Sequence, residues 1–183
     1  MEIDLVQLSR TMAYALRHQP ARFGLTLDAE GWVEVEDLVE ALRKHHHNWQ
    51  QMNVVDIEAV LALPGKQRYE LRAGRIRAYY GHSVQQRMTR EKATPPVHLF
   101  HGTTPAAYEQ IRQTGLRPMG RQYVHLSEDV ETALDVARRR TSQPVILLVS
   151  ALDAHQHNIA FYLGNDSVWL ADSIPTTFLT KQT

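Results

Sequence analysis

Basic side chains in the first half of the chain have the types and the spacing to hold a phosphate. Arg17 and His18 are adjacent near the end of a predicted helix, where the negative end of the helix dipole favours a protonated imidazole. Arg75 and Arg77 alternate along a predicted strand and share one face, where guanidinium groups suit phosphate oxygens. Two ordinary alternatives stay open. Arg17 and His18 could simply cap the helix, and Arg75 and Arg77 could form salt bridges on a solvated strand face.

The second half offers polar residues at the ends of apolar strands. His101-Gly102-Thr103 follows an apolar run directly, at the carboxyl end of a strand, where ligands of open clefts commonly bind. His125 and Ser127 alternate and lie on one side of another predicted strand, a pattern that a cross-strand hydrogen bond explains equally well. The arginines at 138–140 end a predicted helix, where they could bind phosphate or satisfy the last helix carbonyls.

Charge is balanced over the chain but not along it. The 183 residues carry 20 Lys and Arg against 20 Asp and Glu, so net charge gives no argument for nucleic-acid binding. Residues 66–92, however, hold eight basic residues against two acidic ones, and such a stretch could follow a phosphate backbone. The basic residues are Lys66, Arg68, Arg72, Arg75, Arg77, Arg87, Arg90 and Lys92.

Composition excludes several classes of protein. The absence of cysteine excludes disulfides, thiolate catalysis, Cys-ligated zinc and iron–sulfur clusters. His45, His46 and His47 are adjacent at a helix end and point in different directions, so we expect no metal site there. No apolar run approaches the length of a membrane helix, and the start MEIDLVQLSR lacks the features of a signal peptide. We therefore expect a cytoplasmic protein with no membrane association.

The predicted elements fall into two halves and indicate an α+β fold. In the first half we expect helices over 4–18, 35–45 and 54–63, and a hairpin of RYELR and RIRAYY around Ala73-Gly74. Strand-like pieces at 24–28 and 32–35 precede the second helix. Three short helices and a terminal hairpin are typical of a winged helix-turn-helix.

The second half reads as a small α+β domain after an irregular, polar linker. We expect strands at 97–100, 123–127 and 145–149 and in AFYL and VWLA, and helices over 105–114 and 129–140. The domain boundary is placed after Lys92, which gives domains 1–92 and 93–183.

Seven motifs in this order resemble the NAD-dependent RNA 2′-phosphotransferases, the family that removes the 2′-phosphate left at a tRNA splice junction. The resemblance covers nearly the whole chain. It implies an N-terminal winged-helix lobe that binds RNA, a C-terminal ADP-ribosyltransferase-like lobe that binds NAD, and an active site between them. The motifs are LRHQP, DxEGWV, KQRYEL, IRAYYGHS, LFHGT, YVHLS and the basic helix end before PVILLV.

The resemblance also implies roles for particular residues. The family's Arg-His-Arg-Arg tetrad falls on Arg17, His18, Arg68 and one arginine of the 138–140 run. Counting from YVHLS selects Arg139 and counting back from PVILLV selects Arg140; Arg139 is preferred because loops accept insertions more readily than helices. By the same resemblance, the NAD pocket is lined by His101, Gly102, Thr103 and Ser127, with no metal. Tyr80 departs from the family, which usually has Gln before Gly-His-Ser.

The expected reaction consumes NAD and an RNA that carries an internal 2′-phosphate, such as a tRNA. It passes through ADP-ribosylated RNA and releases nicotinamide, RNA with a 2′-hydroxyl group, and ADP-ribose 1″,2″-cyclic phosphate. One alternative is an ADP-ribosyltransferase whose acceptor is a terminal RNA or DNA phosphate and whose product keeps the ADP-ribose. The other is a winged-helix nucleic-acid binder with no activity, in which residues 66–92 contact backbone phosphates.

Overall fold

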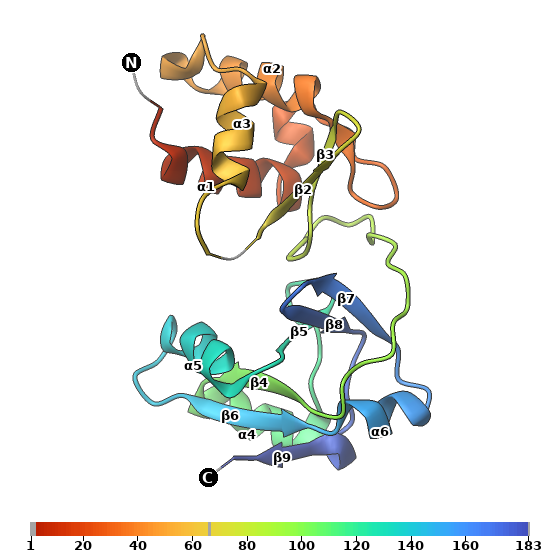
Figure 1. The fold of residues 1–183 in the computed structure, drawn as a ribbon. Coiled ribbons are helices and arrows are strands. Elements are labelled where there is room, and N and C mark those ends of the chain that lie inside the picture. The colour runs from red at the N-terminus through yellow and green to blue at the C-terminus, as the bar shows by residue number, and fades with distance from the viewer. Residues whose placement is uncertain (1–2, 66, 183) are drawn as a thin grey trace. The chain divides into compact units, whose positions relative to one another are not determined.

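The computed structural model describes residues 3–65 and 67–182, and the chain divides into two units between Thr89 and Arg90 (Figure 1). The division falls a few residues before the boundary placed after Lys92 from the sequence. The described residues form six α-helices and two antiparallel sheets, so the fold is α+β, as predicted.

Three helices supply most of the core of the first unit. They are α1 (Leu5–Arg17), α2 (Val35–His45) and α3 (Val54–Leu61), joined by short 3₁₀ turns at Pro20–Phe23 and His47–Trp49. α1 begins where predicted because the Asp4 carboxylate accepts hydrogen bonds from the first free backbone N–H groups, and Asn53 and Asp56 form a capping box on α3. The apolar faces of the helices are fully buried, at Leu8, Met12, Leu16, Leu38, Leu42 and Ile57.

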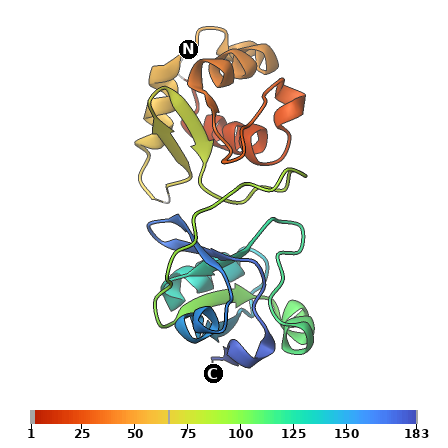
Figure 2. The same ribbon diagram turned by 90° about the vertical axis from the view of Figure 1, so that its right-hand side faces the viewer.

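A small antiparallel sheet completes the first unit. It contains β1 (Val33–Glu34), β2 (Tyr69–Arg72) and β3 (Arg75–Ala78) in the order β1-β3-β2, with Val33 opposite Ile76 and Leu71 opposite Ile76 on the other side. The predicted hairpin is confirmed. Its turn is made by Ala73 and Gly74, both with positive φ. Figures 1 and 2 show the hairpin beside the helices.

One predicted strand of the first unit is wrong. Residues 24–28 form no strand; Leu25 and Leu27 instead bury their side chains in the core, and the backbone N–H of Asp28 bonds to the Trp32 carbonyl across a tight turn. The alternation of apolar residues arises because Leu25 and Leu27 are buried from an irregular segment, and not because the segment pairs with another strand. The piece at 32–35 is likewise a strand only over Val33–Glu34, because α2 begins at Val35.

The second unit is built on a six-stranded antiparallel sheet. Its strands are β4 (Leu99–Thr103), β5 (Val124–Ser127), β6 (Val145–Val149), β7 (Phe161–Asn165), β8 (Val168–Ala171) and β9 (Leu179–Lys181). Their order is β7-β8-β5-β4-β6-β9. The core of this unit is mainly side chains from the strands, among them Leu99, Leu126, Leu147, Val149 and Phe161.

Helices α4 (Pro105–Thr114), α5 (Val130–Arg138) and α6 (Ala151–Gln156) and a 3₁₀ turn at Thr176–Phe178 accompany this sheet. The sequence predicted α4 and all of α5, but it predicted neither α6 nor β9, which are only six and three residues long. α5 packs against β4, β5 and β6 (Figure 1). No helix in the described part of the chain is both long and apolar enough to cross a bilayer.

The contact of α5 with β4 depends on Gly102. A Cβ atom at this position would lie 1.9 Å from the carbonyl oxygen of Ala133, which is helix backbone and cannot rotate away. Glycine is therefore required for the close approach of helix and strand.

We expect Gly102→Ala to lower the free energy of unfolding by at least about 2 kcal/mol, because the methyl group forces the helix off the sheet. Urea denaturation followed by circular dichroism measures this. The matched control is Gly120→Ala, where an added Cβ meets nothing within 4 Å and φ is not positive. Equal stability of the two variants would contradict the packing argument.

Candidate active site

The C-terminal turn of α1 carries Arg17 and His18 and is held from outside the helix by Ser83. The Ser83 backbone N–H donates to the Arg17 carbonyl at 2.9 Å, which occupies one of the helix's last acceptors. The Ser83 hydroxyl oxygen lies 2.8 Å from Nδ1 of His18. The imidazole of His18 is exposed. Its orientation is nevertheless fixed, because Ser83 is bonded both to the backbone of this turn and to the imidazole ring.

Arg17 reaches from α1 to the segment that leads into β2. Its Nη2 donates to the Arg68 carbonyl at 3.2 Å, and the backbone N–H of Tyr79 donates to the same oxygen at 3.0 Å. Arg68 is thus brought, through its backbone carbonyl, to Arg17 and the adjacent His18, although about fifty residues separate it from them in the sequence. These hydrogen bonds lie within the first unit.

A pocket opens beside this group of residues. Its volume is about 280 Å³, and Arg68 lines it together with residues of α1, α3 and the strands. The side chain of Arg68 is exposed. The lining includes Ser9, Val60, Leu61, Leu63, Gln67, Tyr69 and Tyr79.

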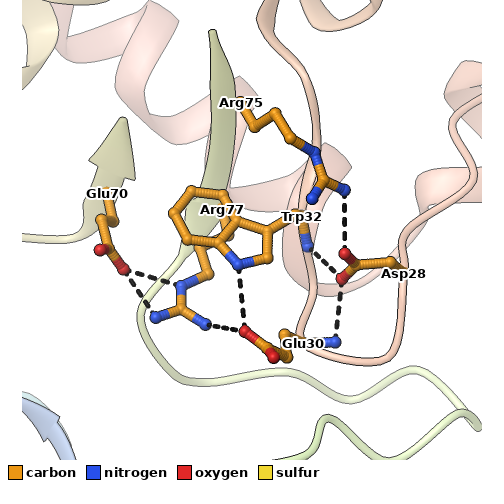
Figure 3. Close-up of polar contacts among 6 residues, drawn as sticks. All are labelled: Asp28, Glu30, Trp32, Glu70, Arg75 and Arg77. Atoms are coloured by element: carbon orange, nitrogen blue, oxygen red, sulfur yellow. Dashed lines mark hydrogen bonds and ion pairs between the residues drawn. The ribbon is translucent and has the colours of Figure 1, made fainter. Parts of the chain in front are cut away.

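Arg75 and Arg77 do share a face of the hairpin, as the alternation predicts, but both are paired with carboxylates (Figure 3). Arg75 Nη2 lies 2.9 Å from Asp28, and Arg77 Nη2 lies 2.7 Å from Glu70. A further contact of 3.4 Å joins Arg77 to Glu30. Of the two interpretations left open by the sequence, the structure favours salt bridges for this pair.

Trp32 lies at the centre of this network. Its ring is buried, and the guanidinium carbons of Arg77, Arg72 and Arg75 lie 4.4, 5.3 and 6.0 Å from the ring centroid, within cation–π range. The indole N–H donates to Glu30 at 3.3 Å. Figure 3 shows the guanidinium of Arg77 between the carboxylates of Glu70 and Glu30. The arginines of this face therefore attach the 28–32 turn to the hairpin.

Asp28 is the carboxylate that organises the turn. It accepts hydrogen bonds from the backbone N–H groups of Glu30 and Trp32, both at 2.9 Å, in addition to its ion pair with Arg75. Burial alone would raise the pKa of the Asp28 carboxyl, but the bonds from Trp32, Arg75 and Glu30 outweigh it, so this pKa lies below its ordinary value. Asp28 thus stabilises the turn in its ionised form.

The site predicted in the second unit centres on strands β4 and β5. The strands are paired where Phe100 lies opposite Ser127, and the His101 ring then bridges them through Nδ1, 3.0 Å from the His125 carbonyl. A carbonyl oxygen can only accept, so Nδ1 carries the proton and Nε2 is the acceptor nitrogen. Burial lowers the pKa of His101, although the bond to His125 acts in the opposite direction, so the ring is neutral at physiological pH.

His101, Gly102 and Thr103 lie within β4 and not, as the sequence predicted, after a strand over 97–100. Thr103 and Ser127 are buried polar side chains at the C-terminal ends of β4 and β5, and because these strands are antiparallel the two ends lie at opposite ends of the pair. Gly102 lies between His101 and Thr103 and faces α5, so its first role is the packing described above. The structure therefore brings the four residues predicted to line a cofactor pocket onto two neighbouring strands.

Arg139 is the C-cap residue of α5, and Arg138 is the last helical residue. Both arginines and Arg140 are exposed, and Arg138 lies 4.0 Å from Asp135. The predicted helix over 129–140 is therefore slightly too long. Arg139 and Arg140 follow the last turn of the helix, and their backbone N–H groups both donate to the Ala137 carbonyl.

Two residues important to the site were not predicted from the sequence. Ser83 belongs to the IRAYYGHS motif, but the sequence gives it no role, and its bonds to Arg17 and His18 join positions far apart in the chain. Tyr69 is buried against α1 and donates its hydroxyl hydrogen to the Ser9 carbonyl, a contact with no signal in the local sequence. The histidines at 45–47 belong to no group of three metal-ligating side chains in the described ranges. His46 stacks on Trp49 at 3.8 Å.

Comparison with known proteins decides the family. Residues 4–173 match the sequence model of the family described as RNA 2′-phosphotransferase, Tpt1 / KptA family. The chain belongs to this family. The probable RNA 2′-phosphotransferase of Acetivibrio thermocellus is 49% identical over 177 residues, which is 97% of this chain and 97% of the relative.

Two further relatives carry the same description. That of Bacillus thuringiensis subsp. konkukian is 44% identical, over 94% of this chain and 92% of the relative. That of Rhizobium rhizogenes is 42% identical, over 95% of this chain and 92% of the relative. The family predicted from the seven motifs is confirmed, and the match spans both units.

We expect Asp28→Ala to lower the free energy of unfolding by about 1 to 2 kcal/mol at pH 7, because two backbone N–H groups and Arg75 lose their acceptor. Asp28→Asn keeps an acceptor oxygen for the backbone and should be less harmful. Because the folded pKa of Asp28 is lower than the ordinary 3.8, its contribution is complete above that pH and is lost as pH falls through the folded value. Denaturation of wild type and Asp28→Asn from pH 7 to pH 3 should therefore show their difference shrinking in acid; a constant difference would contradict the role of the charge.

Proposed function

We propose that this protein is an RNA 2′-phosphotransferase that removes an internal 2′-phosphate from RNA by transferring it to NAD, which is consumed as a co-substrate. The observation that carries the proposal is the convergence of Arg17, His18 and Arg68 in a member of this family. Arginine forks and an imidazole at one surface suit the binding of a phosphate dianion. The first unit, as a winged-helix lobe, would hold the RNA.

The second unit supplies the residues that would bind NAD, in an ADP-ribosyltransferase-like lobe. Their chemistry fits this co-substrate, because neutral His101 and the buried hydroxyls of Thr103 and Ser127 are uncharged hydrogen-bonding groups on a largely apolar sheet. Such groups suit ribose hydroxyls and a carboxamide. Gly102 would leave room for close approach of the strand backbone.

In the first step, an oxygen of the RNA 2′-phosphate attacks the anomeric carbon of the nicotinamide ribose, and the bond to nicotinamide breaks. The electron pair of that bond neutralises the pyridinium, so the leaving group needs no general acid. The nucleophile is already an anion near neutral pH and needs no base. The protein's task is to hold phosphate and ribose in line, which arginines do well.

In the second step, the 2″-hydroxyl of the attached ADP-ribose attacks phosphorus and loses its proton, and the RNA 2′-oxygen leaves and is protonated. The products are RNA with a 2′-hydroxyl group and ADP-ribose 1″,2″-cyclic phosphate. Arg17, Arg68 and Arg139 stabilise the charge that builds on the phosphate oxygens, an effect worth about 3 kcal/mol per donor. Arg140 is the alternative to Arg139. His18 moves a proton in this step.

The deciding experiment incubates the purified protein with NAD and a short RNA that carries one internal 2′-phosphate, with the unphosphorylated RNA as control. We expect the phosphorylated RNA alone to be converted to 2′-hydroxyl RNA, with release of nicotinamide and ADP-ribose cyclic phosphate. RNA that keeps ADP-ribose would point to the transferase alternative. RNA binding with NAD intact would point to a binding protein without activity.

His18→Ala should slow the second step by about 100-fold, because the proton transfer loses its catalyst, and should let ADP-ribosylated RNA accumulate. Single-turnover reactions resolved on denaturing gels measure both steps. The matched control is His47→Ala, an exposed histidine far along the chain, which should react as wild type. Formation of 2′-hydroxyl RNA by His18→Ala at the wild-type rate, without accumulation of the intermediate, would contradict the role of His18 in proton transfer.

A further inference from the structure

The guanidinium group of Arg17 lies within cation–π range of two tyrosine rings. Its central carbon is 5.7 Å from the ring centroid of Tyr69 and 5.4 Å from that of Tyr80. Its Nη2 is also hydrogen-bonded to the Arg68 carbonyl. An arginine on a helix end would otherwise sample many rotamers, so these contacts together select an orientation.

Tyr69 provides a rigid, neutral ring. It is 6% exposed, and its hydroxyl donates to the Ser9 carbonyl on α1. Burial raises the pKa of Tyr69, although the bond to Ser9 and the charges of Arg17 and Arg68 act the other way. The hydroxyl therefore stays protonated, and Tyr69 acts on Arg17 through its ring and not as a phenolate.

Tyr80 lies in the short segment after β3, and both sides of this segment are bonded to the site residues. On one side, Tyr79 donates to the Arg68 carbonyl at 3.0 Å; on the other, Ser83 donates to the Arg17 carbonyl at 2.9 Å. Hydrogen bonds thus fix the backbone on both sides of Tyr80 to the backbone of Arg68 and Arg17.

We propose that Tyr80 is a positioning residue for Arg17, whose ring holds the guanidinium in the orientation that meets the RNA 2′-phosphate. The proposal rests on the proposed function. An aromatic ring attracts the guanidinium through its negative face, and this attraction does not use the N–H donors as an amide or carboxylate oxygen would. Tyr80 therefore supports Arg17 through its ring and without an acceptor atom that competes with the phosphate for those donors.

The kinetic test compares Tyr80→Phe with Tyr80→Leu. The first keeps the ring and should react as wild type, and the second should lower kcat by about 3- to 30-fold with little change in KM for NAD. In an Arg17→Ala background, Tyr80→Leu should have no further effect. Tyr108→Leu is the matched control, because it removes a tyrosine ring 5.1 Å from the Lys181 ammonium in the second unit and should leave kcat unchanged.

A spectroscopic measurement tests the contact without any activity. In ¹⁵N-labelled protein, the Arg17 side-chain N–H signal, assigned by its loss in Arg17→Lys, should be displaced by the ring current of Tyr80. The displacement should persist in Tyr80→Phe and disappear in Tyr80→Leu. Absence of transferase activity in wild type would refute the proposed function while this signal still reports the contact.

Three results would overturn the positioning role. Loss of activity in Tyr80→Phe would show that the hydroxyl group acts directly. An effect of Tyr80→Leu that persists in the Arg17→Ala background would show that the ring acts on something other than Arg17. An Arg17 signal unchanged in Tyr80→Leu would show that the ring does not hold the guanidinium.

Discussion

The hydrogen bonds that join the end of α1 to the segments flanking the hairpin organise the first unit. A helix ends with unpaired carbonyl groups, and here the last turn of α1 is bonded to Ser83, while the Arg17 side chain is bonded to the Arg68 carbonyl just before β2. Neither contact is local in sequence. Both depend on the apolar core below, where the buried faces of α1, α2 and α3 fix the helices against the hairpin. The same bonds that end the helix thus orient the residues proposed for catalysis.

The arginines of the first unit have two different roles: some form salt bridges that stabilise the fold, and others are proposed to bind the substrate. On the outer face of the hairpin, Asp28, Glu30 and Glu70 neutralise Arg75 and Arg77 around the Trp32 ring (Figure 3). Arginines in such a network are held by their partners and stabilise the turn. The guanidinium of Arg17, in contrast, lies within cation–π range of Tyr69 and Tyr80, and it is the charge proposed to bind the phosphate.

In the second unit, β4 carries residues that both pack the fold and are proposed to bind NAD. The strand carries His101, which bridges to β5, and Gly102, which admits the backbone of α5. A larger residue at position 102 would displace the helix whose C-terminal end carries Arg139. His101 and Gly102 therefore have structural roles of their own besides the proposed binding of NAD.

The sequence by itself determined the order of most elements, the family, and the residues proposed for the site. Asp4 and Asn53 mark helix starts, and Ala73-Gly74 marks the hairpin, because caps and turns are local chemistry. The sequence alone did not determine which arginines form salt bridges with carboxylates, nor that residues 24–28 form an irregular segment in place of a strand. Tertiary structure decided these points, because a salt bridge to Asp28 or a bond from Ser83 joins residues tens of positions apart. Local propensity carries no information about such partners, and only the packed core brings them within a few ångströms.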